Sequence, residues 1–183
     1  KVIIISHVGR EPEESLEPVG KAIKHFGAVV FIADLLGQAA KGAAAAMREG
    51  EILLLENLRR DARETENDES FARELASLAD IYVDDAFAAA HRAHASIVGV
   101  AKFLPAYAGF LMCNEVREID AARAPTHPSL AILGGAKFET KAPLVKLLLE
   151  KYEHVFITGA LSNDVFRARG LPVGRSLVSK DLP

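Results

Sequence analysis

The 183-residue sequence contains one cysteine, Cys113, and no apolar run that reaches the ~20 residues needed to cross a bilayer as a helix. A single cysteine cannot form a disulfide within the chain, so the fold does not rely on an internal covalent link. Both absences favour a cytoplasmic protein, and neither gives a reason to expect a membrane partner.

The sequence also has no excess of positive charge. Its 22 lysines and arginines are outnumbered by 25 aspartates and glutamates, which gives a formal net charge of -3 at pH 7. Proteins that bind nucleic acids or anionic membranes commonly present a strongly basic face, so this balance favours neither partner. Any anion that the chain binds is therefore expected to be small.

The sequence does not begin with methionine. Its first residues, KVIIIS, have the composition of a buried strand, and its last residues, LVSKDLP, follow closely on an apolar piece. From these two features we expect the chain to be truncated at both ends.

Half of the residues are apolar, and they fall into short runs that alternate with amphipathic stretches. This alternation is typical of α/β proteins with a parallel sheet, because each pair of parallel strands needs a helical crossover. We predict a Rossmann-like, three-layer α/β/α fold. The predicted strands cover residues 2–6, 28–33, 51–55, 81–84, 130–133 and 155–158.

Two helices bear on the later argument. Asn67 or Asp68 can cap a helix that turns Phe71, Leu75 and Leu78 inward. A longer helix is predicted further along the chain, directly before the segment APTHPS, whose two prolines cannot continue it.

The proline-containing segment APTHPS is the candidate domain boundary. The helix before it is predicted over residues 108–123. The first domain would then cover residues 1–124, and residues 129–183 would form the start of a second domain.

Basic residues follow three of the predicted strands, in the segments SHVGR, ENLRR and DDAFAAAHRAH. In open parallel sheets, ligands bind beyond the carboxyl ends of the strands. A guanidinium group can donate two parallel hydrogen bonds to the oxygen atoms of one phosphate. Several such groups together form an anion pocket. The candidates for this phosphate or carboxylate site are His7, Arg10, Arg59, Arg60, His91, Arg92 and His94.

Ordinary explanations exist for some of these residues. Arg60 lies in the charge-rich segment RRDARETENDE, where a solvated surface residue is expected. His91 and His94 could bond backbone carbonyl groups and shape their loop. Asp84 and Asp85 would point to opposite faces of a strand, so they are not expected to share a metal, and Asp85 is expected to orient a neighbouring arginine.

The segment ILGGAKFETK places a glycine turn and two lysines between a strand and a helix that begins near Ala142. The glycines allow backbone N–H groups to approach a ligand, while Lys137 and Lys141 supply positive charge. The phosphate-loop motif G-x-x-x-x-G-K-[ST] does not occur in the chain. The turn in ITGALSND could approach the same ligand, although Gly134 and Gly135 could equally form a simple tight turn.

In their order along the chain, these motifs resemble the phosphoglycerate kinase family. The resemblance runs through SHVGR, LLLENLRRDARETENDESFARELASLADIYVDDAF, HRAHASIVGVAKFLPAYAGFLM, AILGGAKFETK and TGALSNDVFRARGLPVGRSLVS. It implies a hinge-bending, glycolytic kinase of two domains that moves a phosphoryl group reversibly between 1,3-bisphosphoglycerate and MgADP, giving 3-phosphoglycerate and MgATP. Such a phosphotransferase has a carboxyl group as acceptor, uses Mg with ATP or ADP, and is a cytoplasmic monomer.

The resemblance also implies roles for individual residues. Lys137 corresponds to the lysine that stabilises the phosphoryl group in transit, and Lys141 to the lysine that meets the nucleotide phosphates. Thr158 and Gly159 correspond to positions near the adenine pocket, and no residue of this chain is assigned to the metal. The residues that fall on the patch around the non-transferred phosphate of the glycerate are His7, Arg10, Arg59 and Arg92, with His91 and His94 shaping its wall.

The resemblance further implies that half of each substrate site lies outside this chain. The family's Arg-x-Asp-x-Asn strand should precede Lys1, and the glycine-rich loop and the aspartate that engage the nucleotide phosphates and Mg belong to the missing part. The chain alone is therefore expected to be inactive and to leave strand edges through which it could self-associate. The alternative is a non-catalytic anion-binding or interaction module derived from the kinase.

Overall fold

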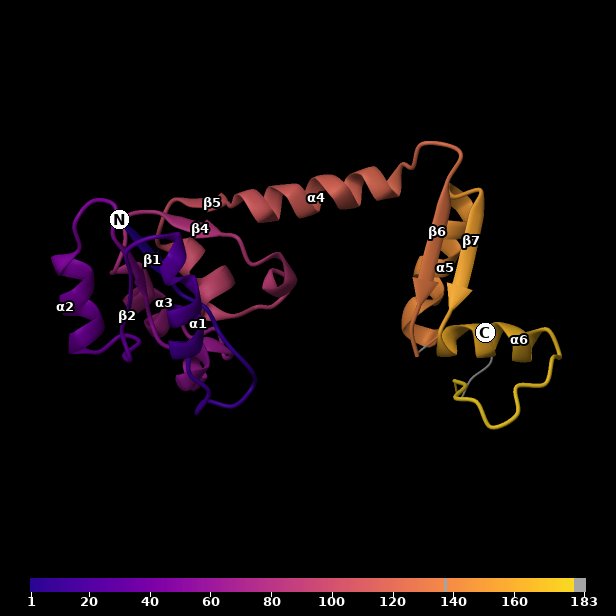
Figure 1. Ribbon diagram of the computed structural model, residues 1–183, viewed down its shortest axis with the longest axis horizontal. Coiled ribbons are helices and arrows are strands. Elements are labelled where there is room, and N and C mark those ends of the chain that lie inside the picture. Colours follow the sequence, from indigo (N-terminus) through magenta and orange to yellow (C-terminus); the bar gives the residue numbers. More distant parts are fainter. Residues whose placement is uncertain (137, 180–183) are drawn as a thin grey trace. The chain divides into compact units, whose positions relative to one another are not determined.

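The structure is a computed structural model that describes residues 1–136 and 138–179 (Figure 1). The chain divides into two compact units, Lys1–Glu115 and Val116–Pro183. Both units contain parallel strands and helices, which confirms the predicted α/β class. All six predicted strands are present, although their ends differ from the predicted ones by up to two residues.

The first sheet of unit Lys1–Glu115 has three parallel strands in the order β1, β3, β2. These strands are β1 (Val2–Ile4), β2 (Val29–Phe31) and β3 (Ile52–Leu54). In the central strand, Ile52 pairs with both Val2 and Val29, and Leu53 and Leu54 are almost completely buried. A central parallel strand is covered on both faces, which explains its unbroken leucine run.

Helices cover both faces of this sheet. The helices of the unit are α1 (Glu17–Ala22), α2 (Gln38–Ala46) and α3 (Glu69–Ala76). The residues of α4 (Phe110–Arg123) belong partly to this unit and partly to the next. Leu53 packs with Ala40 of α2, whereas Leu54 packs with Leu16, next to α1. Because successive strand residues face opposite ways, these contacts place α2 and α1 on opposite faces of the strands, as Figure 1 shows.

Short helical turns connect the regular elements. They are η1 (Ile23–Phe26), η2 (Leu58–Arg60), η3 (Ala62–Glu64), η4 (Phe87–Ala89), η5 (Ala95–Gly99) and η6 (Val100–Lys102). Most of them lie in segments that follow strands, and η2 and η3 hold the basic segment after β3.

The predicted cap of helix α3 is confirmed. The Oδ1 atom of Asp68 accepts a hydrogen bond of 2.9 Å from the backbone N–H of Phe71. Phe71 and Leu75 are buried in one cluster, against which Ile5 and Tyr82 pack. Helix α3 therefore covers the segment after β1 and the start of β4 at the same time.

A second parallel pair in this unit joins β4 (Tyr82–Asp84) to β5 (Ala106–Ala108). The sequence predicted a helix from residue 108, but Ala108 ends strand β5 and helix α4 begins at Phe110. The two alanines of this strand favour helices, although Tyr107 between them favours strands. Pairing with β4 decided the conformation of this segment.

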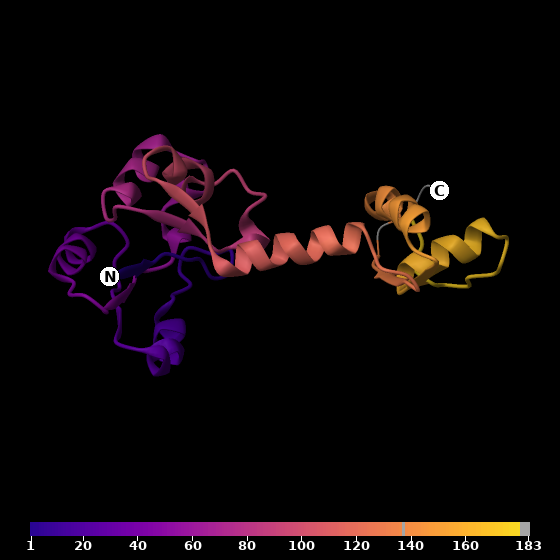
Figure 2. The same ribbon diagram turned by 90° about the horizontal axis from the view of Figure 1, so that it is seen from above.

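Unit Val116–Pro183 contains one parallel pair, β6 (Leu130–Gly134) and β7 (His154–Thr158), which runs from Leu130 opposite His154 to Gly134 opposite Thr158. Helices α5 (Phe138–Lys151) and α6 (Ala160–Ala168) follow the two strands (Figures 1 and 2). Helix α5 begins at Phe138, four residues before the predicted start at Ala142. Pro143 lies inside the helix.

The helices of the described residues are short. The longest, α4 and α5, have 14 residues each, whereas about 20 are needed to cross a bilayer. In the part of the chain that the structure describes, no helix has both the length and the apolar character that a membrane span requires.

Phe71 gives a test of this core. Its side chain is 0% exposed, so Phe71→Ala is expected to lower the free energy of unfolding by about 3–5 kcal/mol through lost burial and the cavity left behind. Phe26 is 75% exposed, and Phe26→Ala should change the same quantity by at most about 0.5 kcal/mol. Urea unfolding followed by circular dichroism measures both. Equal losses in the two variants would contradict the described packing of α3.

Candidate functional site

The segment after β1 is fastened to the end of β3 by Asn57. Its side chain is 0% exposed. Its Nδ2 donates to the carbonyl oxygens of Val8 (3.0 Å) and Glu14 (2.9 Å), and its Oδ1 accepts from the backbone N–H groups of Val8 (3.4 Å) and Arg59 (3.1 Å). One buried amide therefore positions both ends of the loop after β1 and the backbone of Arg59.

Glu56, the preceding residue, fastens the same loop further along. Its carboxylate is 2% exposed. It accepts from the backbone N–H groups of Leu16 (2.9 Å) and Asn57 (2.7 Å) and from the Ser15 hydroxyl (2.8 Å). The Arg60 guanidinium lies 3.3 Å away. The sequence pattern pointed to the arginines of ENLRR and not to Glu56 and Asn57, although two polar residues directly after buried leucines are a signal of such a role.

Glu56 is held in its charged form. Burial by itself raises the pKa of this carboxyl group, but the hydrogen bonds from Leu16, Asn57 and Ser15, helped by the charge of Arg60, bring the pKa below its usual value of 4.5. A buried carboxylate with several donors is stable as an anion, whereas the protonated form would lose part of these bonds.

Three of the predicted site residues, Arg59, Arg92 and His94, act electrostatically on a fourth, His7. Burial lowers the pKa of the His7 imidazole, and Arg59, Arg92 and His94 lower it further, while Glu64 opposes them. His7 follows β1, Arg59 follows β3, and Arg92 and His94 lie after β4. Charged side chains that follow two other strands thus act on His7.

Arg59 has an unused hydrogen-bond donor. Its Nε atom is buried and has no hydrogen-bond partner within residues 1–136 and 138–179. A buried donor without an acceptor costs about 1–3 kcal/mol. An oxygen atom of an anionic ligand at this position would remove that cost.

The His94 side chain contacts a carboxylate. Within the described residues, it forms no hydrogen bond to a backbone carbonyl, which was the alternative to a role in the anion site. Its Nδ1 lies 3.5 Å from Oε1 of Glu64, and the side chains are 17% and 4% exposed. His91 and Arg10 are exposed, and neither forms a hydrogen bond or ion pair within the described ranges. Arg60 binds Glu56 and lies 3.5 Å from the carbonyl oxygen of Glu13. The structure therefore brings together only some of the predicted residues.

The two neighbouring aspartates serve the backbone. Asp84 Oδ1 accepts from the N–H of Ala86 (2.9 Å), and Asp85 Oδ1 accepts from the N–H of Met112 (2.9 Å), in the first turn of α4. The prediction that Asp85 orients an arginine is wrong, because its carboxylate caps this helix instead. Across residues 1–136 and 138–179, no group of three or more His, Cys, Asp or Glu side chains is placed to hold a metal ion.

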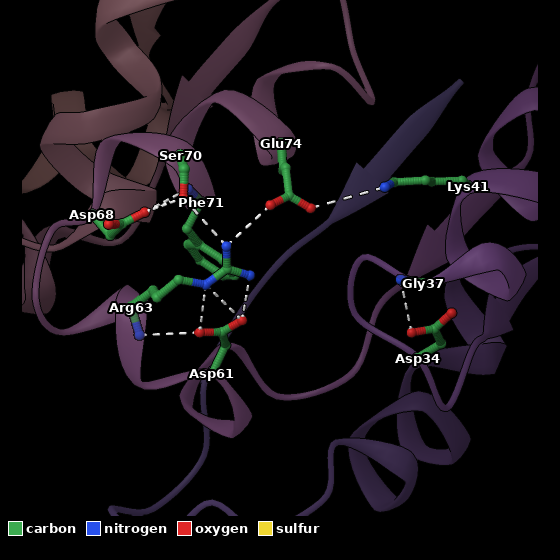
Figure 3. Close-up of polar contacts among 9 residues, drawn as sticks. All are labelled: Asp34, Gly37, Lys41, Asp61, Arg63, Asp68, Ser70, Phe71 and Glu74. Carbon is green, nitrogen blue, oxygen red and sulfur yellow. Dashed lines mark hydrogen bonds and ion pairs between the residues drawn. The ribbon is translucent and has the colours of Figure 1, made fainter.

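An ion-pair network fixes the turn η3 (Figure 3). Arg63 donates from Nε and Nη2 to Asp61, at 3.0 Å and 2.7 Å, and from Nη1 to Glu74, at 3.0 Å. Its guanidinium also lies over the Phe71 ring, 5.1 Å from the centroid, and Lys41 Nζ lies 3.8 Å from Glu74. The charges of this network neutralise one another, so its role is to hold η3 against α2 and α3.

In unit Val116–Pro183, the turns after β6 and β7 touch. Gly159 has a φ of 66°, and a Cβ atom there would lie 3.4 Å from the backbone N and O of Gly135. A Cβ on Gly134 would lie 3.1 Å from the Thr158 methyl group, and one on Gly135 would lie 3.5 Å from Cε of Lys141. The positive φ favours glycine at residue 159, and the close approach of the Thr158 methyl group favours it at residue 134. Three residues predicted to contact the nucleotide, Lys141, Thr158 and Gly159, thus lie at the two turns that follow β6 and β7.

Lys137 was predicted to be catalytic, but it lies outside the described residues. Its assigned role therefore stays a prediction.

Asp164 is a buried carboxylate that the sequence analysis missed. It is 0% exposed and accepts from the backbone N–H and the hydroxyl of Ser179, at 2.7 Å and 3.0 Å. The Ser179 hydroxyl in turn accepts from the N–H of Phe138, at 3.2 Å. Asp164 therefore fastens the segment after α6 to the start of α5, next to the paired turns.

These features define an α/β protein with parallel strands, whose strand ends carry basic side chains in one unit and close glycine turns with a lysine in the other. A family model described as phosphoglycerate kinase matches residues 1–182. The chain belongs to the phosphoglycerate kinase family.

Curated relatives with this name match the chain throughout. The phosphoglycerate kinase of Moorella thermoacetica is 46% identical over 189 residues, which cover 99% of this chain and 48% of that protein. The one from Aquifex aeolicus is 45% identical over 190 residues, covering 100% and 48%. The chain thus spans about half the length of the curated relatives it matches.

Solved structures agree with the fold. The phosphoglycerate kinase from Pyrococcus horikoshii OT3 has a TM-score of 0.84 at 31% identity, covering 96% of this chain and 47% of that chain. The one from Coxiella burnetii has a TM-score of 0.79 at 36% identity, covering 98% and 47%. These neighbours support the predicted Rossmann-like architecture.

The Glu56 network predicts a pH-dependent loss of stability. Glu56→Gln is expected to lower the free energy of unfolding by about 1–3 kcal/mol at pH 7, because the amide cannot accept from all of the same donors. The native protein has this stabilisation above the ordinary pKa of 4.5 and loses it as the pH falls through the lower folded value. The difference between the two proteins should therefore shrink in acid.

Urea unfolding at pH 7 and at several lower pH values measures this difference. Glu17, 54% exposed and paired with Lys21, provides the control, and Glu17→Gln should change the free energy of unfolding by at most about 0.5 kcal/mol. A loss in Glu56→Gln that stays constant across the pH range would refute the charged network.

Proposed function

We propose that this chain is part of a phosphoglycerate kinase, in which residues 1–124 belong to the glycerate-binding domain and residues 129–183 begin the nucleotide-binding domain. The whole enzyme would move a phosphoryl group reversibly between 1,3-bisphosphoglycerate and MgADP, giving 3-phosphoglycerate and MgATP, in the cytoplasm. The family match supports the reaction. The observation that carries the substrate site is the convergence of His7, Arg59 and Arg92 from three strand ends.

The basic cluster of the first unit would bind the non-transferred phosphate of the glycerate. Arg59 and Arg92 can each present two donors to a phosphate, and Arg59 Nε has no acceptor among the described residues. His7, whose pKa is lowered, is suited to bind as a neutral imidazole. Arg10, in the exposed segment after β1, and His91 would complete the wall when the ligand is present.

The paired glycine turns of the second unit would approach the nucleotide. Lys141, whose stem lies beside Gly135, would meet the nucleotide phosphates, and Thr158 and Gly159 would border the adenine. Lys137 would stabilise the phosphoryl group in transit. Phosphoryl transfer needs positioning and charge neutralisation more than a protein nucleophile, and these residue types supply both.

Mg, bound with ATP or ADP, would neutralise charge on the phosphates. The residues of ranges 1–136 and 138–179 offer no cluster of metal ligands, so we propose that the part of the enzyme outside this chain holds the ion. We therefore expect the chain alone to be inactive. From the family resemblance, we expect the complete enzyme to be monomeric. The comparisons give no support to the alternative of a non-catalytic module.

Binding of 3-phosphoglycerate tests the basic cluster. Charge-assisted hydrogen bonds contribute about 1.5–3 kcal/mol each, so Arg92→Ala should weaken binding about tenfold or more. Arg60, which is held by Glu56, serves as the matched control, and Arg60→Ala should leave the affinity nearly unchanged. Calorimetric titration at low and high salt measures both, and binding should weaken as salt increases. Equal affinities of the two variants would remove Arg92 from the site.

Catalysis is tested with the chain and with a completed enzyme, in which the missing segments are taken from the Moorella thermoacetica relative. The 183 residues alone should give no measurable ATP in a coupled assay from 1,3-bisphosphoglycerate and MgADP. In the completed enzyme, Lys137→Ala should lower kcat with little change in KM, because its interaction forms mainly in the transition state. An unchanged kcat would exclude the proposed role of Lys137, and turnover by the isolated chain would show that it needs no other segment.

A further inference from the structure

Glu64 is a buried carboxylate beside the basic cluster, although nothing in its sequence position suggested a role. It is 3% exposed. Its Oε2 accepts from the backbone N–H of Ser96 at 2.9 Å, and its Oε1 accepts from the Ser96 hydroxyl at 2.6 Å. Oε1 also lies 3.5 Å from Nδ1 of His94. Both carboxylate oxygen atoms of Glu64 thus contact residues 94–96, and Ser96 is 32 residues away in sequence.

The position of Glu64 is fixed from the other side. It ends the turn η3, in which the Asp61 side chain accepts from the backbone N–H of Arg63, and Arg63 links this turn to Glu74 of α3 (Figure 3). A carboxylate on a fixed turn can act as an anchor for the segment that joins η4 to η5. The anchored loop holds Arg92, and Ala95, next to Ser96, is 0% exposed.

Glu64 also reaches the groups on the other strand ends. Its charge raises the pKa of His7, in opposition to burial and to Arg59 and Arg92. Burial, followed by Asp84 and Glu64, raises the pKa of Tyr82. The carboxylate therefore lies within electrostatic range of the segments after β1 and of strand β4, as well as of its own loop contacts.

We propose that Glu64 is a positioning residue of the anion site: it holds Ser96 and His94 so that the loop of residues 91–96 presents Arg92 beside His7 and Arg59. The inference rests on the proposed function, because it concerns the site proposed there for the phosphate of the glycerate. Glu64 itself does not touch the ligand.

Two physical effects of Glu64 on anion binding have opposite signs. A negative charge next to a phosphate site repels the ligand, so a role through charge alone means that removing the charge strengthens binding. A role in ordering the loop means that removing the anchor weakens binding, because the ligand must then order Arg92 as it binds. The two hydrogen bonds to Ser96 and the burial of Glu64 favour the second effect.

Glu64→Gln, which keeps the shape of the side chain, decides between these effects. We expect it to weaken binding of inorganic phosphate and of 3-phosphoglycerate about threefold to tenfold, as for the loss of one or two neutral hydrogen bonds. Ser96→Ala removes one anchor contact and keeps the charge, so it should weaken binding in the same direction even if Glu64→Gln folds poorly. Glu17→Gln, at an exposed carboxylate that pairs with Lys21, should leave affinity unchanged.

NMR titrations of the 183-residue chain measure these affinities, and two further readouts follow the anchor itself. In Glu64→Gln, the backbone amide of Ser96 should exchange with solvent faster, and the pKa of His7 should fall because the carboxylate that raises it is gone. Tighter or equal phosphate binding in Glu64→Gln, or unchanged binding in Ser96→Ala, would overturn the proposal.

The failure of the proposed function can be told apart from the failure of this inference. If the native chain binds neither ligand, the phosphate site itself is refuted. The anchor is then judged by Ser96 exchange alone: faster exchange in Glu64→Gln upholds the loop anchor, and unchanged exchange refutes it.

Discussion

The buried hydrogen bonds of Glu56 and Asn57 are the constraint on which the rest of the first unit depends. Both residues come directly after the central strand, where the backbone leaves the sheet, and together they bind the loop after β1 at both ends. A loop cannot be held there by apolar packing alone, because its backbone N–H and C=O groups need partners when buried. Two polar side chains supply those partners, and the loop with His7 takes one position.

The same solution recurs at two other places. Glu64 holds the loop after β4, and Asp164 holds the segment after α6. In each case a buried carboxylate accepts from a backbone N–H and from a serine hydroxyl. Because low dielectric strengthens such bonds and makes unpaired groups costly, a satisfied carboxylate selects one loop conformation. In the first unit, the buried carboxylates of Glu56 and Glu64 therefore hold the segments that carry the basic side chains.

Much of the fold and part of the site could be predicted from residue patterns. All six apolar runs became strands, Asp68 caps α3, and Arg59 and Arg92 act electrostatically on His7. The errors have local causes. Two of the three residues of strand β5 are alanines, which favour helices, and the strand forms through its pairing with β4. Helix α5 begins four residues before its predicted start.

The sequence by itself determined the α/β class and the types of residue at the strand ends, because apolar periodicity and chain order are local properties. Only the tertiary structure decided which polar residues are buried and which residues are their hydrogen-bond partners. Glu64 and Ser96 are 32 residues apart, and Asn57 and Val8 are 49 apart. Such pairs meet only after the strands align, since the energy of a buried hydrogen bond depends on the geometry of both partners and on the exclusion of water around them.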